Sequence, residues 1–380
     1  MKKKVIAFIG LFISSRLLFA QIPVKHTLNL SIWDPVATSP YDSLSMTRVT
    51  LGLSSKTYQL KGVGINLLAH FNEHRVSGFS LNGVGEFVNG NMNGVEVAGL
   101  FNVVTGHMHG VQIAAVQNTS VQHAKGMMIA GITNFAIGNA RGIQLAGVTN
   151  MAGSHFSGVQ ISSGVNIATS SSDLLQLAGM VNVCSEPING IQIGMGNYAG
   201  GVNGVQAGLL NLCGGEVKGV QVGIINHSKD TSAVKIGLVN INPKTRIQLM
   251  TYGGNTTKIN TAVRFKNTYT YSILGIGTHY LGLNEKFSGS LFYRVGAGLT
   301  PFKRAFISSD AGFSHIENFD NESQATPERM YSLQLRLNLE YYPLSRLGIF
   351  ASGGYAHTRY YKANRIYENK PIVELGIILF

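Results

Sequence analysis

Three histidines recur at one phase of a repeating sequence and are the residues best placed to bind a metal. His107, His123 and His155 are separated by sixteen or thirty-two residues, and imidazole is a common transition-metal ligand. Other polar residues share this phase: Arg75, Asn91, Asn139 and Ser171. Such variety is typical of an exposed turn, so the sequence leaves two interpretations open, a metal or anion column at His107 and His123 or a solvent-facing turn.

The two cysteines also share a phase of the repeat. Cys184 and Cys213 each lie two residues after a repeat asparagine. If each repeat is one coil of about 4.8 Å, two coil steps place them about 9–10 Å apart. A disulfide needs Cα atoms closer than about 7 Å. We therefore expect two unpaired cysteines that fill the interior.

A third group of candidate residues lies near the C-terminus and consists of charged side chains on alternating segments. These residues are Arg294, Asp310, Arg336 and Glu340. Small barrels fill their interior with side chains, where charges are expected to pair. Asp310 with His315 or His357 and a serine would suggest a hydrolase, but no spacing supports one. The glycine-rich GGVNG at 200–204 lacks the lysine and helix of a nucleotide-binding loop, so we expect no enzyme and no cofactor.

The histidines and cysteines belong to a repeat array that covers residues 59–242. This segment holds 31 of the 46 glycines. Its units start at Gly62, Gly78, Gly94, Gly110, Gly126, Gly142, Gly158, Leu174, Gly190, Gly204, Gly219 and Ala233. A column of asparagines follows: Asn102, Asn118, Asn134, Asn150, Asn166, Asn182, Asn197, Asn211, Asn226 and Asn240. Glutamine recurs two residues after many starts: Gln112, Gln144, Gln160, Gln176, Gln192, Gln206 and Gln221.

A period of sixteen residues predicts an all-β array of about twelve stacked coils, a β-solenoid. We expect Val, Ile and Leu to fill the coil interior and the Asn and Gln amides to form ladders between coils. An alternative remains, because GVEVAGLFN at 94–102 alternates like a membrane strand. The repeats would then be strands of a wide porin or transporter barrel, although they lack the aromatic girdles of such barrels.

Residues 243–380 follow different rules and predict an outer-membrane β-barrel. They contain 12 of the 15 tyrosines. In YSLQLRLNLEYYP at 331–343, an apolar face that includes Leu337 alternates with a polar face that includes Arg336 and Glu340, which fits lipid outside and a polar lumen inside. Eight alternating runs predict eight antiparallel strands, or ten if residues 21–58 add two. The chain ends on Phe380, like many barrel strands, but Glu374 shares its face, so either that face is not uniformly exposed to lipid or the strand has a bulge.

The remaining segments set the compartment and exclude one class of partner. Residues 1–20 have the basic start, short apolar core and small-residue exit of a secretory signal. No later stretch is long enough for a membrane helix, and residues 21–58 read as a β lead-in or cap. The net charge is +12, but residues 59–242 are neutral overall. We therefore expect no nucleic-acid partner.

The sequence resembles the surface repeat-containing outer-membrane proteins of Gram-negative bacteria. The resemblance rests on the signal, the lead-in, the tandem GVQxAGxxN units and the C-terminal barrel taken together. The resemblance covers nearly the whole mature chain and implies an outer-membrane location, but it carries over no catalytic residue. It favours a non-enzymatic protein whose barrel is held in outer-membrane lipid. The array would present an extended surface to a glycan or protein that the sequence does not identify. Whether the array faces outside, the periplasm or the lumen stays open.

Overall fold

The computed structural model describes residues 24–42, 44–170, 173–231, 233–279, 287–319, 329–361 and 365–379. The predicted signal at residues 1–20 and the terminal Phe380 lie outside the described residues. Within the described part, no helix is long and apolar enough to cross a membrane. The chain divides into two compact units, Met1–Ser170 and Ser171–Phe380, which are described in turn.

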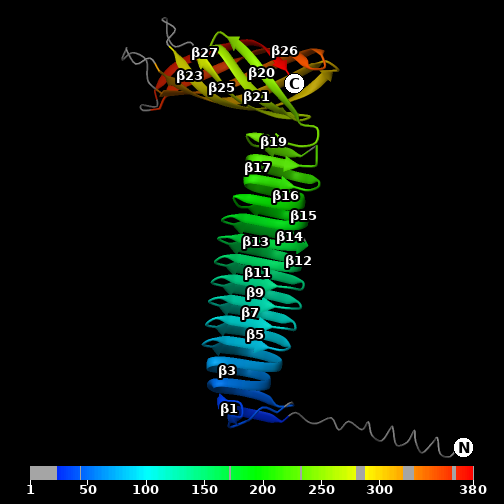
Figure 1. Cartoon of the computed structure of the whole chain (residues 1–380), viewed down its shortest axis with the longest axis vertical. Coiled ribbons are helices and arrows are strands. Elements are labelled where there is room, and N and C mark those ends of the chain that lie inside the picture. The colour runs from blue at the N-terminus through cyan, green and yellow to red at the C-terminus, as the bar shows by residue number, and fades with distance from the viewer. Residues whose placement is uncertain are drawn as a thin grey trace, which may run out of the picture. The chain divides into compact units, whose positions relative to one another are not determined.

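The first unit is a stack of parallel β-solenoid coils (Figure 1). Its strands are β1 (Lys25–Trp33), β2 (Val36–Ala37), β3 (Met46–Asn82), β4 (Gly85–Val88), β5 (Asn91–Ala98), β6 (Phe101–Val104), β7 (Met108–Ala114), β8 (Gln117–Ser120), β9 (Ala124–Ala130), β10 (Thr133–Ala136), β11 (Ala140–Ala146), β12 (Thr149–Ser162) and β13 (Val165–Ser170). Equivalent residues pair sixteen positions apart, as Gly126 does with Gly142 and Asn134 with Asn150.

The second unit continues with coils of the same kind. Its solenoid strands are β14 (Asp173–Ala178), β15 (Val181–Ile193), β16 (Gly196–Cys213), β17 (Val217–Ser228), β18 (Val234–Ile236) and β19 (Val239–Ile241). The offset between paired residues shortens to fifteen for Asn182 with Asn197 and to fourteen for Gln192 with Gln206. Strands that pair in parallel, each residue with its equivalent in the next coil, are not the antiparallel strands of a wide barrel. The solenoid prediction is therefore confirmed, and the wide-barrel alternative is wrong.

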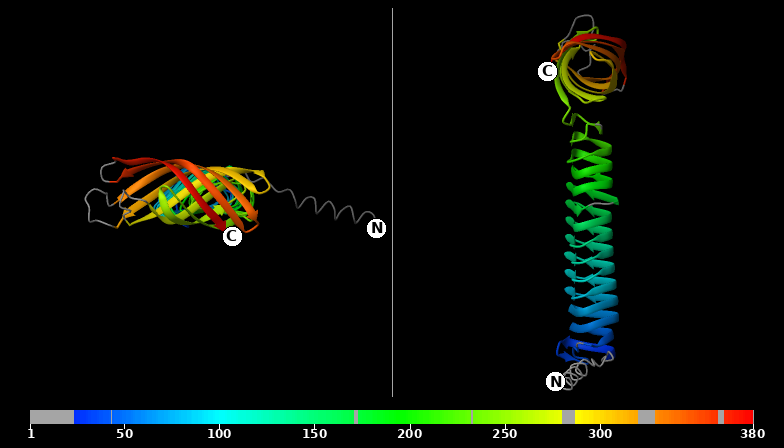
Figure 2. Two further views of the ribbon diagram at one scale, coloured as in Figure 1. Left: turned by 90° about the horizontal axis from the view of Figure 1, so that it is seen from above. Right: turned by 90° about the vertical axis from the view of Figure 1, so that its right-hand side faces the viewer.

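After the last coil, the second unit forms a closed antiparallel barrel (Figure 2). The barrel strands are β20 (Arg246–Gly254), β21 (Thr257–Lys266), β22 (Thr270–His279), β23 (Ser288–Phe302), β24 (Ala305–Asn318), β25 (Arg329–Leu344), β26 (Leu347–Tyr360) and β27 (Ile366–Leu379). β20 closes the ring against β27. The eight-stranded prediction is confirmed. The ten-stranded variant is wrong, because lead-in strand β1 pairs in parallel with β3 of the solenoid.

The glycine that starts each unit meets two backbone constraints, seen clearly at Gly142. Its φ is 134°, a conformation that L residues rarely adopt. A Cβ built on Gly142 would lie 1.9 Å from the carbonyl oxygen of Gly126 in the preceding coil. The recurring glycine therefore reflects a positive-φ position within the strand that packs against its own copy in the neighbouring coil.

The prediction that aliphatic residues fill the coil interior is wrong. In the coil that begins at Gly142, the side chains of Gln144, Asn150 and Phe156 are almost fully buried, whereas Val148 is 49% exposed. Ile161 of the next coil is likewise 39% exposed. Alternation puts every second strand residue on the same face, and the amides occupy the inner face. The inner face thus combines the amide columns with buried apolar side chains such as Met108, Ala136 and Phe156, whereas many aliphatic residues of the repeat lie outside.

A polar interior is stable here because each amide is bonded to its copy in the neighbouring coil, and bonded amides bury at little cost. Asn150 Nδ2 donates to Asn166 Oδ1 at 2.9 Å and to the Ile161 carbonyl at 2.8 Å, while Asn150 Oδ1 accepts from Asn134 at 2.9 Å. Asparagine amides donate to the following coil throughout, from Asn102 to Asn118 and from Asn226 to Asn240.

The glutamine ladder runs with the opposite polarity. Gln160 Nε2 donates back to Gln144 Oε1 at 2.7 Å, and Gln206 donates back to Gln192 at 2.8 Å. In the last coil Lys235, a donor without an acceptor atom, takes the glutamine phase. Its Nζ donates to the Ile241 carbonyl at 2.7 Å, and burial lowers its pKa to about 8.

The glutamine ladder is interrupted once, at Met128. Gln112 Oε1 finds no donor among the described residues, because Met128 of the next coil has none to offer. On the other side, Gln144 Nε2 reaches only the Met128 sulfur, at 3.8 Å. One methionine therefore leaves two buried amides poorly satisfied.

We expect Met128→Gln to stabilise the protein, because the new amide would accept from Gln144 and donate to Gln112. An unsatisfied buried group costs about 1–3 kcal/mol, so the gain should be of that order. Hydrogen exchange of β7, β9 and β11 in the full chain measures it. Met127→Gln, on the half-exposed outer face, is the matched control and should show no gain. Equal or lower protection in Met128→Gln would contradict the ladder.

Candidate functional site

The barrel has an apolar wall and a polar lumen. On β25 the outward Leu335 and Leu337 are 66% and 68% exposed, whereas the inward Arg336 and Glu340 are almost fully buried. This is the arrangement that alternation along the strand predicts, with the wall suited to lipid and the charges turned inward. The lumen is therefore the first place to look for chemistry.

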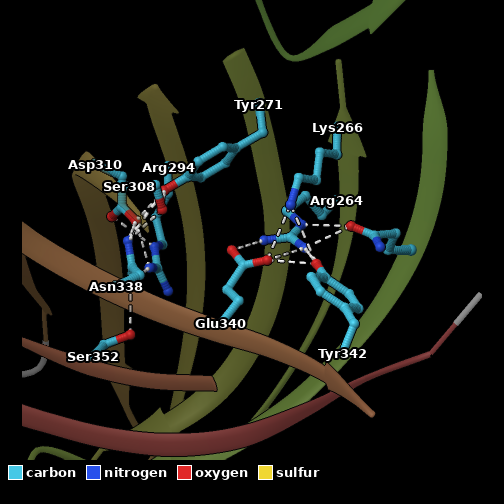
Figure 3. Close-up of polar contacts among 11 residues, drawn as sticks. Arg264, Lys266, Tyr271, Arg294, Ser308, Asp310, Asn338, Glu340, Tyr342 and Ser352 are labelled. Atoms are coloured by element: carbon cyan, nitrogen blue, oxygen red, sulfur yellow. Dashed lines mark hydrogen bonds and ion pairs between the residues drawn. The ribbon is translucent and has the colours of Figure 1, made fainter. Parts of the chain in front are cut away.

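One lumen cluster is centred on Arg264 of β21 (Figure 3). Its Nη1 donates to Glu340 Oε1 at 2.6 Å and its Nε donates to Gln248 Oε1 at 2.8 Å. Lys266 Nζ lies 3.1 Å from Glu340 Oε2, and Tyr342 OH donates to the same oxygen. Glu340, predicted as a lumen residue, is thus held by two cations and a phenol.

The second lumen cluster joins Arg294 and Asp310 on neighbouring strands (Figure 3). Arg294 Nε donates to Asp310 Oδ1 at 2.9 Å, and Nη2 donates to Oδ2 at 2.6 Å, which is a two-point ion pair. Tyr271 OH and Asn338 Nδ2 also donate to Asp310 Oδ2. Every oxygen of this buried carboxylate has a donor, so the pair is structurally satisfied.

The fourth predicted lumen residue, Arg336, pairs with Glu374. Arg336 Nε and Nη2 lie 2.9 Å from the two Glu374 oxygens. Glu374 is fully buried, as are Ile372 and Ile378 on the same face of β27, whereas Leu375 is 67% exposed. Of the two alternatives for Glu374, a face that is not uniformly exposed to lipid is the correct one, because the face that it shares with Ile378 is the inner one.

Side chains occupy the barrel interior. An aromatic and aliphatic cluster adds to the ion pairs: Met250, Tyr252, Ala262, Tyr271, Ile273, Phe292, Phe306, Phe350 and Ile378. Three guanidinium groups face three carboxylates, so the charges nearly balance. An eight-stranded barrel filled in this way leaves no room for an aqueous channel. The side chains in the lumen stabilise the barrel wall.

A cavity of about 1120 Å³ opens at the end of the barrel where the shortest hairpins lie. Its rim includes six basic residues: Lys244, Arg246, Lys266, Lys303, Arg304 and Arg346. Glu340 lies next to Lys266 below the rim. Sequence analysis placed the basic excess outside residues 59–242 but not at one mouth, because that grouping needs the closed barrel.

The residues of the conceivable hydrolase set are not brought together. Asp310 is buried in the lumen against Arg294. His315 is half-exposed and contacts Tyr361 at 3.0 Å, and His357 contacts Asn369. Both histidines sit at positions of the opposite parity to the lumen residues of their strands, so they face away from Asp310.

The histidines and cysteines lie at the positions that stacking of the coils predicts. The rings of His107 and His123 lie parallel with centroids 5.0 Å apart. Among the described residues, no group of three or more His, Cys, Asp or Glu side chains is arranged to hold a metal. Cys184 and Cys213 are buried and free. Burial raises the pKa of both thiols, which keeps them protonated and poorly reactive.

Sequence analysis missed a network of charged residues inside the first coils. His70 and Glu86 occupy the asparagine phase of their units, and the phase was the signal that could have found them. His70 Nδ1 lies 2.8 Å from Glu86 Oε1, with both side chains fully buried. Ser80 and Asn82 donate to the other Glu86 oxygen. The pair is therefore enclosed and fully hydrogen-bonded.

Glu96 occupies the glutamine phase one coil later, at the end of the ladder. Gln112 Nε2 donates to Glu96 Oε2 at 3.0 Å, whereas Glu96 Oε1 meets no donor among the described residues. Burial, with a contribution from the charge of Glu86, raises the pKa of Glu96 well above its usual value. Each glutamine of the ladder donates its hydrogen bond toward this end, so the side chain at the end only needs to accept one. A carboxylate, which has no N–H group, fits that position.

No family model and no curated protein matches this chain. Three solved barrels resemble about a third of it. The N-terminal barrel domain of Pseudomonas aeruginosa OprF has 13% identity and a TM-score of 0.28, over 35% of this chain and 95% of that one. Neisserial surface protein A has 7% identity and a TM-score of 0.26, over 35% of this chain and 93% of that one. Ail of Yersinia pestis has 16% identity and a TM-score of 0.22, over 35% of this chain and 95% of that one.

We expect Glu96→Gln to remove a loss of stability that occurs as pH rises. A raised folded-state pKa means that stability is full below the unfolded pKa and declines as pH rises through the folded one. Unfolding of the wild type should therefore become easier as pH rises above the ordinary glutamate pKa, and the variant should change less. Glu73→Gln, on a half-buried surface pair with Lys56, is the control. Parallel pH profiles for wild type and Glu96→Gln would refute the assignment.

We expect Leu337→Arg to impair barrel assembly, because an arginine on the lipid face near the midplane costs about 2–4 kcal/mol. Arg336→Leu should also impair it, since buried Glu374 would lose its two-point partner and keep only the longer 3.9 Å contact with Arg294 Nη1. Adding Glu374→Leu should rescue Arg336→Leu but not Leu337→Arg. Heat-modifiable gel mobility after folding into lipid vesicles measures assembly. Rescue of both variants, or of neither, would contradict the assigned faces.

Proposed function

We propose that the chain is a non-enzymatic outer-membrane protein in which the barrel β20–β27 is the anchor. The repeat array would be the part that presents a binding or structural surface. The observation that carries this proposal is the closed eight-stranded barrel with an apolar wall and a lumen of paired charges. Such a barrel satisfies all its backbone groups internally and exposes only apolar side chains to lipid.

The hairpin lengths favour a periplasmic array. Three connections on one side of the barrel are short: 267–269, 303–304 and 345–346. The other side carries one two-residue connection, 255–256, and three longer ones, 280–287, 319–328 and 361–365. Short turns are typical of the periplasmic side, and the chain enters β20 on that side at Arg246. The array that precedes it would then be periplasmic, in contrast to the surface location in the family name that the repeats resemble.

The array suits binding rather than chemistry. Its interior is closed by ladders, and its exterior repeats the same side chains from coil to coil, which offers an extended regular face. The cluster contacts described above give each buried acid a structural partner or a ladder role. A pore is not favoured, because side chains fill the lumen.

Cysteine accessibility on intact cells tests the proposal. In a Cys184→Ala, Cys213→Ala background, Ser154→Cys reports on the array and Tyr361→Cys on the longer barrel connections. We expect an impermeant thiol reagent to label Tyr361→Cys on intact cells, and to label Ser154→Cys only after the outer membrane is permeabilised. The opposite pattern would reverse the topology. Failure of the full chain to fractionate with the outer membrane would remove the anchor role.

A further inference from the structure

The solenoid coils of residues 94–168 have two outer faces and one edge without charge. The outward positions of these coils hold residues such as Val95, Ile113, Leu145 and Ile161. The edge where the chain turns between the two faces is also aliphatic, with Leu100 at 40%, Ile132 at 46% and Val148 at 49% exposure. Soluble surfaces rarely expose apolar areas that repeat over many coils. A covering partner is therefore expected.

All charges of these coils gather at the opposite edge, and they are basic. Lys125 and Arg141 stand one residue before the unit glycine, in the same column as His109. His123 and His155 lie in the neighbouring exposed column. The coils carry Glu96 as well, but it is sealed inside the ladder. In cross-section the coil is amphipathic, with a cationic edge, an aliphatic opposite edge and uncharged faces that also carry threonines such as Thr133 and Thr149.

The backbone of the aliphatic edge is satisfied within the solenoid. The amides of Gly147 and Val148 donate to carbonyls of the preceding coil at 3.1 and 3.0 Å. The Leu145 carbonyl accepts from the Asn134 side chain at 2.7 Å. The same pattern recurs one coil earlier, where Ile132 donates to Val116. A surface in contact with hydrocarbon must leave no backbone group unpaired, and a turn in water has no such requirement.

The dimensions also suit lipid. Residues 143–148 extend about 16 Å at about 3.3 Å per residue. The hydrocarbon of one leaflet is about 15 Å thick, half of a core of about 30 Å. Interfacial elements place basic residues at anionic headgroups and aliphatic residues among acyl chains, which is the distribution seen in the coils that carry Lys125 and Arg141.

We propose that coils 94–168 lie in one leaflet of a membrane, with the aliphatic edge among acyl chains and the basic edge at anionic lipid headgroups. This inference rests on the proposed function, because the barrel holds the chain at the membrane. It names lipid as the partner of the array. A second copy of the chain fits the aliphatic faces but gives the basic edge no anionic partner, so lipid is the better complement.

Depth-dependent quenching in the full chain tests the proposal. Trp33 is the single tryptophan, so a Trp33→Phe background is free of signal. Val148→Trp reports on the aliphatic edge, His155→Trp on the basic edge of the same coil, and Leu337→Trp on the barrel wall. Each protein is folded into vesicles of phosphatidylglycerol and phosphatidylcholine with brominated acyl chains, and aqueous iodide is the second quencher.

We expect bromolipid to quench Val148→Trp and Leu337→Trp strongly and iodide to quench His155→Trp. Replacing Lys125 and Arg141 by Glu should weaken docking by at least about fivefold per residue, seen as lower bromolipid quenching at position 148. If Leu337→Trp is quenched and Val148→Trp responds only to iodide, the coils stand in water and this inference fails. Shielding of Val148→Trp from both quenchers would assign the face to protein. Absence of bromolipid quenching at position 337 would instead contradict the proposal that the barrel is the membrane anchor.

Discussion

The repeat half of this protein depends on one constraint: a buried amide must find its hydrogen bonds in the coils above and below it. An asparagine such as Asn134 bonds to the next asparagine and to a turn carbonyl at once. That double contact fixes the register between coils and the position of the turn. Because only an identical side chain at the same phase completes it, the sequence repeats. The aliphatic residues are then left for the outside.

This explains what could and could not be predicted from the sequence. The sixteen-residue period predicts coils and register, and alternation on β25 predicts that Arg336 and Leu337 face opposite ways. Alternation does not say which face of a coil is the inner one, because neither face of a unit such as Gly142–Met151 carries a charge. The usual preference for buried aliphatic residues gave the wrong answer, since the ladder makes amide burial inexpensive.

The lumen illustrates a second limit. Arg264 and Glu340 are 76 residues apart in the chain and meet only because the barrel closes at one register. Composition indicates that lumen charges should pair, but the partner of each charge follows from strand order and tilt. Arg336 pairs with Glu374 rather than with a carboxylate of its own strand. The same reasoning covers the basic mouth, whose residues come from separate hairpins.

The opposed directions of the two amide ladders have a consequence for how such arrays change in evolution. Within either ladder, a unit that carries the amide presents the same donor and acceptor to each neighbour, and Met128 interrupts the glutamine ladder. A duplicated or deleted unit that carries both amides therefore leaves its neighbours bonded as before. The ends differ, because Glu96 offers only acceptors when ionised and Lys235 only donors. Arrays of this kind can thus vary in length by whole units from the middle, while the residues at their two ends stay under separate selection.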